Sequence, residues 1–71
     1  MSISYKKLWK LLIDKDMTKT QLREKADIAT STLAKLSKDE QVSMDVLLRI
    51  CKTLDCDIAD IMELIKESKN V

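Results

Sequence analysis

The 71-residue chain contains no glycine and no proline, and this absence limits the folds that it can form. Tight two-residue hairpin turns depend mainly on glycine, and the sequence shows no sustained alternation of polar and apolar residues. A sheet protein of this size therefore lacks both its turns and its strand pattern. We expect a single all-α domain over residues 1–71, a compact bundle of five helices with short connections.

Residues 18–37 have the pattern of two short helices joined by a turn. Thr18 followed three residues later by Gln21 has the form of a capping box, which predicts that a helix begins there. Leu22 and Ala26 then lie four residues apart on one face of that helix. The spacing breaks after Ala26, so we expect a turn before the next helix.

That next helix is capped by Ala29 or Thr30 and directs Leu33 and Leu36 inward. Burial of its leucines leaves a small polar and basic surface on the outside. The residues of this surface are Thr30, Ser31, Thr32 and Lys35. A protruding second helix of this kind suits the major groove of DNA.

Three more helices are expected around this pair. Ser4 can cap a first helix that runs to about Asp14, Ser43 can cap a fourth, and Asp57 starts a fifth, after which residues 66–71 are expected to fray. The predicted core consists of aliphatic residues and one cysteine: Leu8, Leu12, Leu22, Ile28, Leu33, Leu36, Leu47, Cys51, Leu54 and Ile61.

Charge is divided unevenly along the chain although the net charge is only +1. Residues 1–38 hold nine Lys or Arg against four Asp or Glu, a balance of +5, whereas residues 39–71 hold four against eight, a balance of −4. The positive half contains the two-helix pattern. This coincidence favours an anionic partner for that half over a purely solvated surface.

Several classes of protein are disfavoured by the residues present. The chain has no His and no Gly-rich phosphate loop, so we expect no enzymatic activity, no cofactor and no small-molecule ligand. Cys51 and Cys56 have no metal-binding or redox spacing, and we interpret both as small buried residues rather than metal ligands. No segment is long and apolar enough for a signal peptide or a membrane span, which predicts a cytoplasmic protein without a membrane partner.

The order of these parts resembles Cro/repressor-type (XRE-like) helix-turn-helix transcriptional regulators. The similarity covers about residues 3–65, and the segments that carry it are TKTQLREKA, STLAKL, VLLRICKTLDC and DIADIMEL. It implies a λ-repressor-like domain that binds double-stranded DNA in a sequence-specific way and regulates transcription, in the first instance as a repressor. The third helix would enter the major groove.

The resemblance also implies roles for individual residues. Lys19, which opens the second helix, would contact a phosphate, while Thr30 and Ser31 would reach base edges and Lys35 bases or backbone. Independently of the family, the start of the second helix offers unpaired N–H groups to a phosphate, and hydroxyl groups can read base edges. We therefore predict base contacts by Thr30, Ser31 and Lys35. Phosphate contacts are predicted for Thr18, Lys19, Thr32 and Lys38.

The sequence departs from the family pattern in three places. Asp27 stands in the turn where many members have Gly, and Asp tolerates positive φ less well than Gly. Arg23 stands where many members have Ala, so its stem is expected to lie along the surface. After the third helix, Lys38 is followed by Asp39 and Glu40, whose carboxylates are expected to repel phosphates and lower the affinity for DNA.

Self-association is expected through the fifth helix, whose apolar residues cover more than one stripe. We predict a homodimer with Ile61, Leu64 and Ile65 in its interface. An alternative function for the same fold is a protein-interaction module, such as an antitoxin or an accessory regulator, in which the acidic second half binds another protein.

Overall fold

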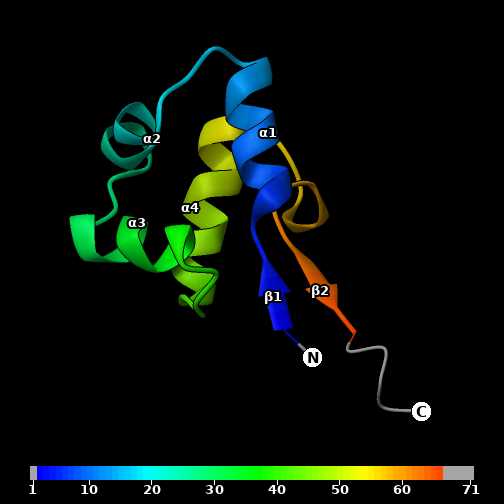
Figure 1. Cartoon of the computed structure of the whole chain (residues 1–71). Helices are drawn as coiled ribbons and strands as arrows, with labels where there is room; N and C mark the ends of the chain where they lie inside the picture. The colour runs from blue at the N-terminus through cyan, green and yellow to red at the C-terminus, as the bar shows by residue number, and fades with distance from the viewer. Residues whose placement is uncertain (1, 67–71) are drawn as a thin grey trace.

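A computed structural model describes residues 2–66 of the chain (Figure 1). These residues form four α-helices, one turn of 3-10 helix and two short strands. Along the chain they are β1 (Ser2–Ser4), α1 (Lys6–Asp14), α2 (Lys19–Ala26), α3 (Thr30–Ser37), α4 (Met44–Leu54), η1 (Ile58–Asp60) and β2 (Glu63–Ile65). The predicted fraying of residues 66–71 falls, except for Lys66, outside the described residues.

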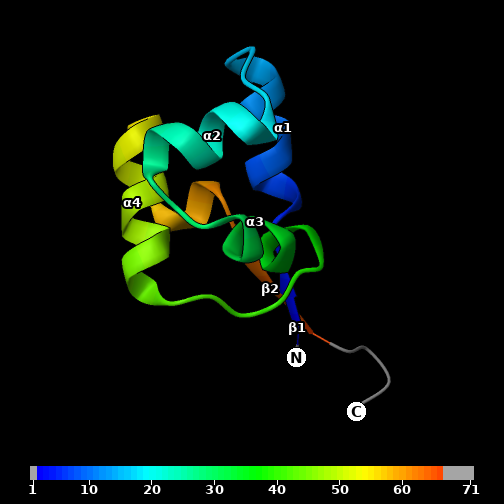
Figure 2. The same cartoon turned by 90° about the vertical axis from the view of Figure 1, so that its left-hand side faces the viewer.

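The helices pack around a small core, and the two strands extend from it as a ribbon (Figure 1). α2 packs against α4 and α3, while η1 packs against both α1 and α4. In Figure 2, α2 and α3 lie on the side that faces the viewer, between α4 and α1. Within residues 2–66 no helix has the length and apolar character of a membrane span.

The core agrees with the sequence prediction at nine of its ten residues, and Leu33 is the exception. Leu33 is only partly buried, whereas Leu36 of the same helix is fully buried. Leu33 is therefore wrongly assigned to the core, because α3 is a short helix that turns a single residue, Leu36, fully inward. The buried apolar cluster comprises Tyr5, Leu8, Leu12, Leu22, Ala26, Ile28, Leu36, Leu47, Ile50, Cys51, Leu54 and Ile61.

The prediction of an all-α chain with five helices is wrong at both ends of the chain. Ser4 does not cap α1: it ends β1, and its hydroxyl oxygen accepts a hydrogen bond from the Lys6 N–H over 3.3 Å. The N-cap residue is Tyr5. The expected fifth helix is a single 3-10 turn, because Ile61 is buried in the core and the chain then turns into β2.

β1 and β2 pair in antiparallel fashion, with Ser2 opposite Ile65, Ile3 opposite Leu64 and Ser4 opposite Glu63. No hairpin connects these strands, since they come from opposite ends of the chain. The absence of glycine therefore did not forbid them. Each strand has only three residues, too few to show an alternating pattern in the sequence.

All four α-helices end in the same way, with an aspartate in the left-handed region of backbone conformation. These residues are Asp16, Asp27, Asp39 and Asp55, with φ between 54° and 57°. After each aspartate, the next N–H donates a hydrogen bond to the carbonyl five residues earlier, over 2.9–3.1 Å. This hydrogen bond defines the Schellman motif, in which glycine usually takes the left-handed position. Within residues 2–66, this glycine-free chain thus closes each α-helix with Asp.

Candidate nucleic-acid interface

The predicted capping box at the start of α2 is confirmed. The Thr18 hydroxyl oxygen accepts a hydrogen bond from the Gln21 N–H over 3.1 Å, and the Gln21 side-chain carbonyl accepts one from the Thr18 N–H over 2.9 Å. A hydroxyl has two lone pairs and one proton. Thr18 can therefore fix the start of α2 and still donate its proton to another acceptor, because its side chain is exposed.

Lys19, the first residue of α2, is held between α1 and α3. Its ammonium nitrogen lies 4.2 Å from the centroid of the Trp9 ring in α1 and 3.5 Å from the hydroxyl oxygen of Ser37 at the end of α3. The first distance is within the range of a cation–π interaction. The Lys19 side chain is thus exposed but has a defined position in the free protein.

The turn between α2 and α3 is fixed from α4. Asp27 adopts φ 56° and ψ 52°, which is the left-handed conformation that glycine adopts most easily. Arg49 donates a hydrogen bond to the Asp27 carbonyl over 2.8 Å, and its guanidinium lies 3.9 Å from the Asp27 carboxylate. A second carboxylate, that of Asp45, lies 3.0 Å from the Arg49 Nε. Arg49 therefore connects α4 to the turn that sets the angle between α2 and α3.

The side chains on the outward face of α3 do not cap the helix. Its N-cap is Ala29, and it has no side-chain cap, so the hydroxyl groups of Thr30 and Ser31 are not used to cap the helix. Residues with exposed side chains follow the outward side of the helix, whereas Thr32 is partly buried on its flank. The outward face, which we call the α3 face, consists of Thr30, Ser31, Ala34 and Lys35.

The segment after α3 is tied to the start of α1. The Asp39 carboxylate accepts a hydrogen bond from the Tyr5 N–H over 3.0 Å, and the Glu40 carbonyl accepts one from the Tyr5 hydroxyl over 2.9 Å. Tyr5 is buried, and both its burial and the nearby charge of Asp39 raise the pKa of its hydroxyl. Asp39 thus has a structural role, in addition to the negative charge that it places beside Lys38.

Three residues of this region were missed by sequence reasoning. Ala34 lies on the α3 face but has no polar group, so a pattern of hydrogen-bonding side chains does not include it. Trp9 and Arg49 are absent from the predicted site. The contacts of Trp9 with Lys19 and of Arg49 with Asp27 join segments that are far apart in the sequence. Local residue spacing therefore cannot predict them.

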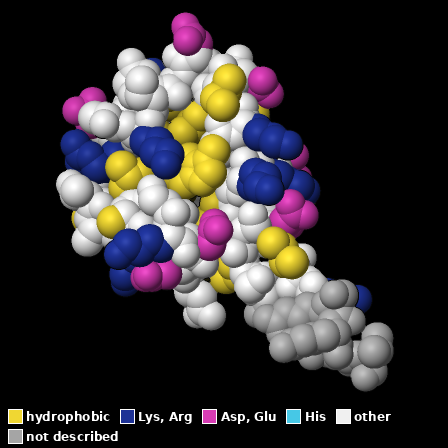
Figure 3. Space-filling model, in the orientation of Figure 1, with side chains coloured by type: hydrophobic (Ala, Val, Ile, Leu, Met, Phe, Trp, Pro, Cys, Tyr) yellow, Lys and Arg dark blue, Asp and Glu magenta, His cyan; other side chains and the backbone are white. Residues whose placement is uncertain are grey.

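On the face seen in Figure 3, basic side chains do not form one continuous area. In Figure 3, which views the molecule as in Figure 1, Lys and Arg side chains are interspersed with Asp and Glu and with patches of apolar surface. Long-range attraction of an anion is therefore weak at a net charge of +1, and local contacts must supply specificity.

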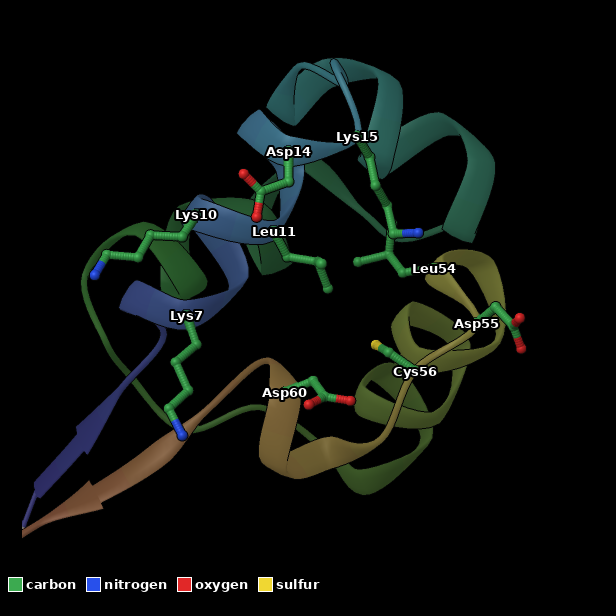
Figure 4. A pocket seen from close by; sticks show the side chains of 9 residues that line it. All are labelled: Lys7, Lys10, Leu11, Asp14, Lys15, Leu54, Asp55, Cys56 and Asp60. Atoms are coloured by element: carbon green, nitrogen blue, oxygen red, sulfur yellow. The ribbon is translucent and has the colours of Figure 1, made fainter.

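A surface depression lies elsewhere, between α1 and the segment from the end of α4 to η1. It has a volume of about 410 Å³, and Figure 4 shows Lys7 and Lys10 on one wall and Cys56 and Asp60 on the other. The Lys7 ammonium donates a hydrogen bond to the Ala59 carbonyl over 3.3 Å.

Cys51 and Cys56 are free thiols, and burial raises the pKa of each, that of Cys56 to about 11. Across residues 2–66 no cluster of three metal-ligating side chains occurs.

The three residues predicted for a dimer interface occupy different environments. Ile61 is 0% exposed and belongs to the core of its own chain, so it has no surface to offer a second copy. Leu64 and Ile65 lie in β2 and are 60% and 46% exposed. They stand at the ribbon rather than on a fifth helix.

This region consists of a capped helix, a left-handed turn and a second helix whose polar face has no capping role. Together these parts form a helix-turn-helix unit within a small helical domain. Residues 7–67 match the family described as the Cro/C1-type helix-turn-helix DNA-binding domain, and the chain belongs to this family. The crystal structure of the transcriptional regulator VanUg is similar to this chain, with a TM-score of 0.90 and 56% sequence identity over 93% of this chain and 88% of that one. No curated protein sequence matches the chain.

Proposed function

We propose that this protein is a transcriptional regulator, in the first instance a repressor, that binds double-stranded DNA with α3 in the major groove. The observation that carries the proposal is the α3 face, because its side chains are exposed and do not cap the helix, and because Arg49 of α4 holds the turn that precedes α3. Membership of a DNA-binding family and similarity to a transcriptional regulator support it.

Base contacts are assigned to the α3 face. Thr30 and Ser31 lie in the first turn of α3, where a recognition helix approaches base edges most closely, and Lys35 lies one turn further on. The methyl group of Ala34 suits a thymine methyl. The hydroxyl groups of Thr30 and Ser31 do not form a two-point hydrogen bond with one base, so discrimination at the base pairs that they contact is expected at the low end of about 1–3 kcal/mol.

Phosphate contacts are assigned to residues at the edges of the motif. Lys19 and Thr18 open α2, where N–H groups and the positive end of the helix dipole favour an anion. Thr32 on the flank of α3 and Lys38 at its end complete the set. Such contacts position the protein on the duplex without reading sequence.

A homodimer is part of the proposal, with the β1–β2 ribbon as the interface. An isolated two-stranded ribbon is marginally stable and leaves unpaired backbone groups along its edges. A second copy packed on it would cover the exposed Leu64 and Ile65. In such a dimer the two α3 helices would lie about 34–36 Å apart and read a near-palindromic site.

The dimer interface can be tested by comparing two exposed leucines. Leu64→Glu should shift sedimentation from dimer to monomer at micromolar concentration, whereas Leu48→Glu, at a similarly exposed position on α4, should leave the dimer intact. The reverse result would move the interface to α4. A wild-type monomer at high concentration would refute self-association.

DNA binding is tested by fluorescence anisotropy with random and selected duplexes at two salt concentrations. Lys19→Ala should weaken binding to all duplexes and lower the salt slope by about one unit per half-site, whereas Ser31→Ala should change preference among sequences and leave the slope unchanged. The control for lost positive charge is Lys10→Ala, because Lys10 lines the surface depression between α1 and η1, away from the α3 face. Folded protein that binds neither duplex at low salt would instead favour the protein-interaction module.

The two carboxylates that follow α3, those of Asp39 and Glu40, allow a test of whether this segment lies beside the DNA backbone. The double variant Asp39→Asn and Glu40→Gln removes both carboxylates but keeps a side-chain oxygen to accept the Tyr5 N–H. If this segment lies beside the DNA backbone, the variant should bind random duplexes more tightly than the wild type. Unchanged affinity would place the segment away from the backbone.

A further inference from the structure

Lys19 occupies a position where a cation does not help its own helix. The first turn of α2 carries no acidic residue, and a positive charge at a helix N-terminus opposes the helix dipole. Neighbouring helices instead hold its ammonium group, through the ring of Trp9 and the hydroxyl of Ser37. This arrangement is explained better by a role in binding than by the stability of α2.

Trp9 is suited to position this lysine. It is the single Trp of the chain, and it packs against the core while part of its surface stays open. A free lysine side chain loses rotamer entropy when a ligand immobilises it. A lysine already confined over an aromatic ring loses less, which favours binding through preorganisation.

We propose that Trp9 is a positioning residue for DNA binding: its ring holds the Lys19 ammonium between α1 and α3, in place to meet a phosphate of the duplex. The proposal rests on the proposed function, which assigns Lys19 to a phosphate. Trp9 itself need not touch DNA. The Ser37 hydroxyl, 3.5 Å from the same nitrogen, assists as a second and weaker contact.

A double-mutant cycle on Trp9 and Lys19 tests the proposal. With Lys19 present, Trp9→Leu should weaken binding to a random duplex about three-fold, the size expected from an exposed cation–π interaction of about 0.5–1 kcal/mol. In the Lys19→Ala background the same change should have no effect. Trp9→Phe, which keeps an aromatic face, should fall between wild type and Trp9→Leu.

A readout without DNA separates positioning from simple packing. In nuclear magnetic resonance spectra of the free protein, the ε-methylene protons of Lys19 should be shifted by the ring current of Trp9, and this shift should vanish in Trp9→Leu. If Trp9→Leu does not fold, Ser37→Ala gives a second route. That variant should weaken binding up to two-fold with Lys19 present and not at all in Lys19→Ala.

The outcomes are distinguishable. If Lys19→Ala weakens binding but the two substitutions act independently, Trp9 is only a packing residue, and the positioning role is refuted while the proposed function stands. An unshifted Lys19 signal in the wild type would also refute it. If the wild type binds no DNA, the proposed function and this inference fail together.

Discussion

Arg49 donates a hydrogen bond to the backbone carbonyl of Asp27 over 2.8 Å, and this contact joins α4 to the turn of the helix-turn-helix motif. The two residues are 22 positions apart in the sequence. Asp27 is the left-handed residue of the turn, so the contact holds the one point where the chain changes direction between α2 and α3.

Loss of this contact should affect DNA binding more than stability. Arg49→Met removes the guanidinium but keeps an unbranched stem. Because the Arg49 side chain is about half exposed, we expect a loss of only about 0.5–1 kcal/mol in the free energy of unfolding, measured with urea. Affinity for a selected duplex should fall several-fold, since the angle of α3 is no longer fixed. Lys52→Met, on the same helix, should change neither quantity.

Two leucines of α3 should differ in their contribution to stability. Leu36→Ala leaves a cavity at a fully buried site and should cost about 2–5 kcal/mol, comparable with the whole stability of so small a domain. Leu33→Ala, at a partly exposed site, should cost clearly less. Thermal melting of both variants checks this. Equal losses would show that Leu33 is as buried as Leu36.

Replacement of helix-ending aspartates by glycine should stabilise the protein where the carboxylate has no partner. At Asp55, Gly removes a left-handed penalty of about 1–2 kcal/mol and gives up about 0.5–1 kcal/mol to the freer unfolded chain. We expect a net gain of about 0.5–1 kcal/mol in urea unfolding.

Asp39→Gly is the matched contrast, because the Asp39 carboxylate accepts the Tyr5 N–H. Its loss leaves a buried donor unpaired, at a cost of about 1–3 kcal/mol, so this variant should be less stable than the wild type. A stabilised Asp39→Gly would contradict the importance of that hydrogen bond.

Stability should decrease at alkaline pH. Burial raises the pKa of the Cys56 thiol from 9.0 to about 11, so the folded state favours the neutral thiol. The resulting contribution to stability is fully present below about pH 9 and is lost as the pH rises through about 11. Urea unfolding under reducing conditions at pH 8 and pH 11 measures the difference. Cys56→Ala should reduce it, and the remainder should come from groups such as Tyr5, whose pKa is also raised.

The helix-turn-helix motif could be predicted because its determinants are local. The capping box at Thr18 and Gln21 and the spacing of Leu22 and Ala26 lie within one or two turns of helix, and each is confirmed. The cap of α4 at Ser43 belongs to the same class, with its hydroxyl accepting the Val46 N–H over 3.3 Å.

The C-terminal region could not be predicted because distant residues decide it. Asp57 and Asp60 do form a capping box, as the start of a helix requires, yet the helix stops after one turn. Backbone groups that a longer helix would have paired internally pair with β1 instead, where Glu63 lies opposite Ser4, 59 residues earlier in the chain. Asp57 and Asp60 therefore predicted the start of this helix correctly, but no local residue pattern indicated that it would end after one turn.

Tyr5 follows the last residue of β1 directly, and its two hydrogen bonds hold the segment that leaves α3. The ribbon and α3 are therefore separated by a single buried side chain rather than by a flexible connection. In a pair of molecules joined through their ribbons, this tyrosine would fix the distance and the angle between the two α3 helices. The spacing of the two halves of a DNA site would then be set inside each subunit, at a residue that touches neither the DNA nor the other subunit.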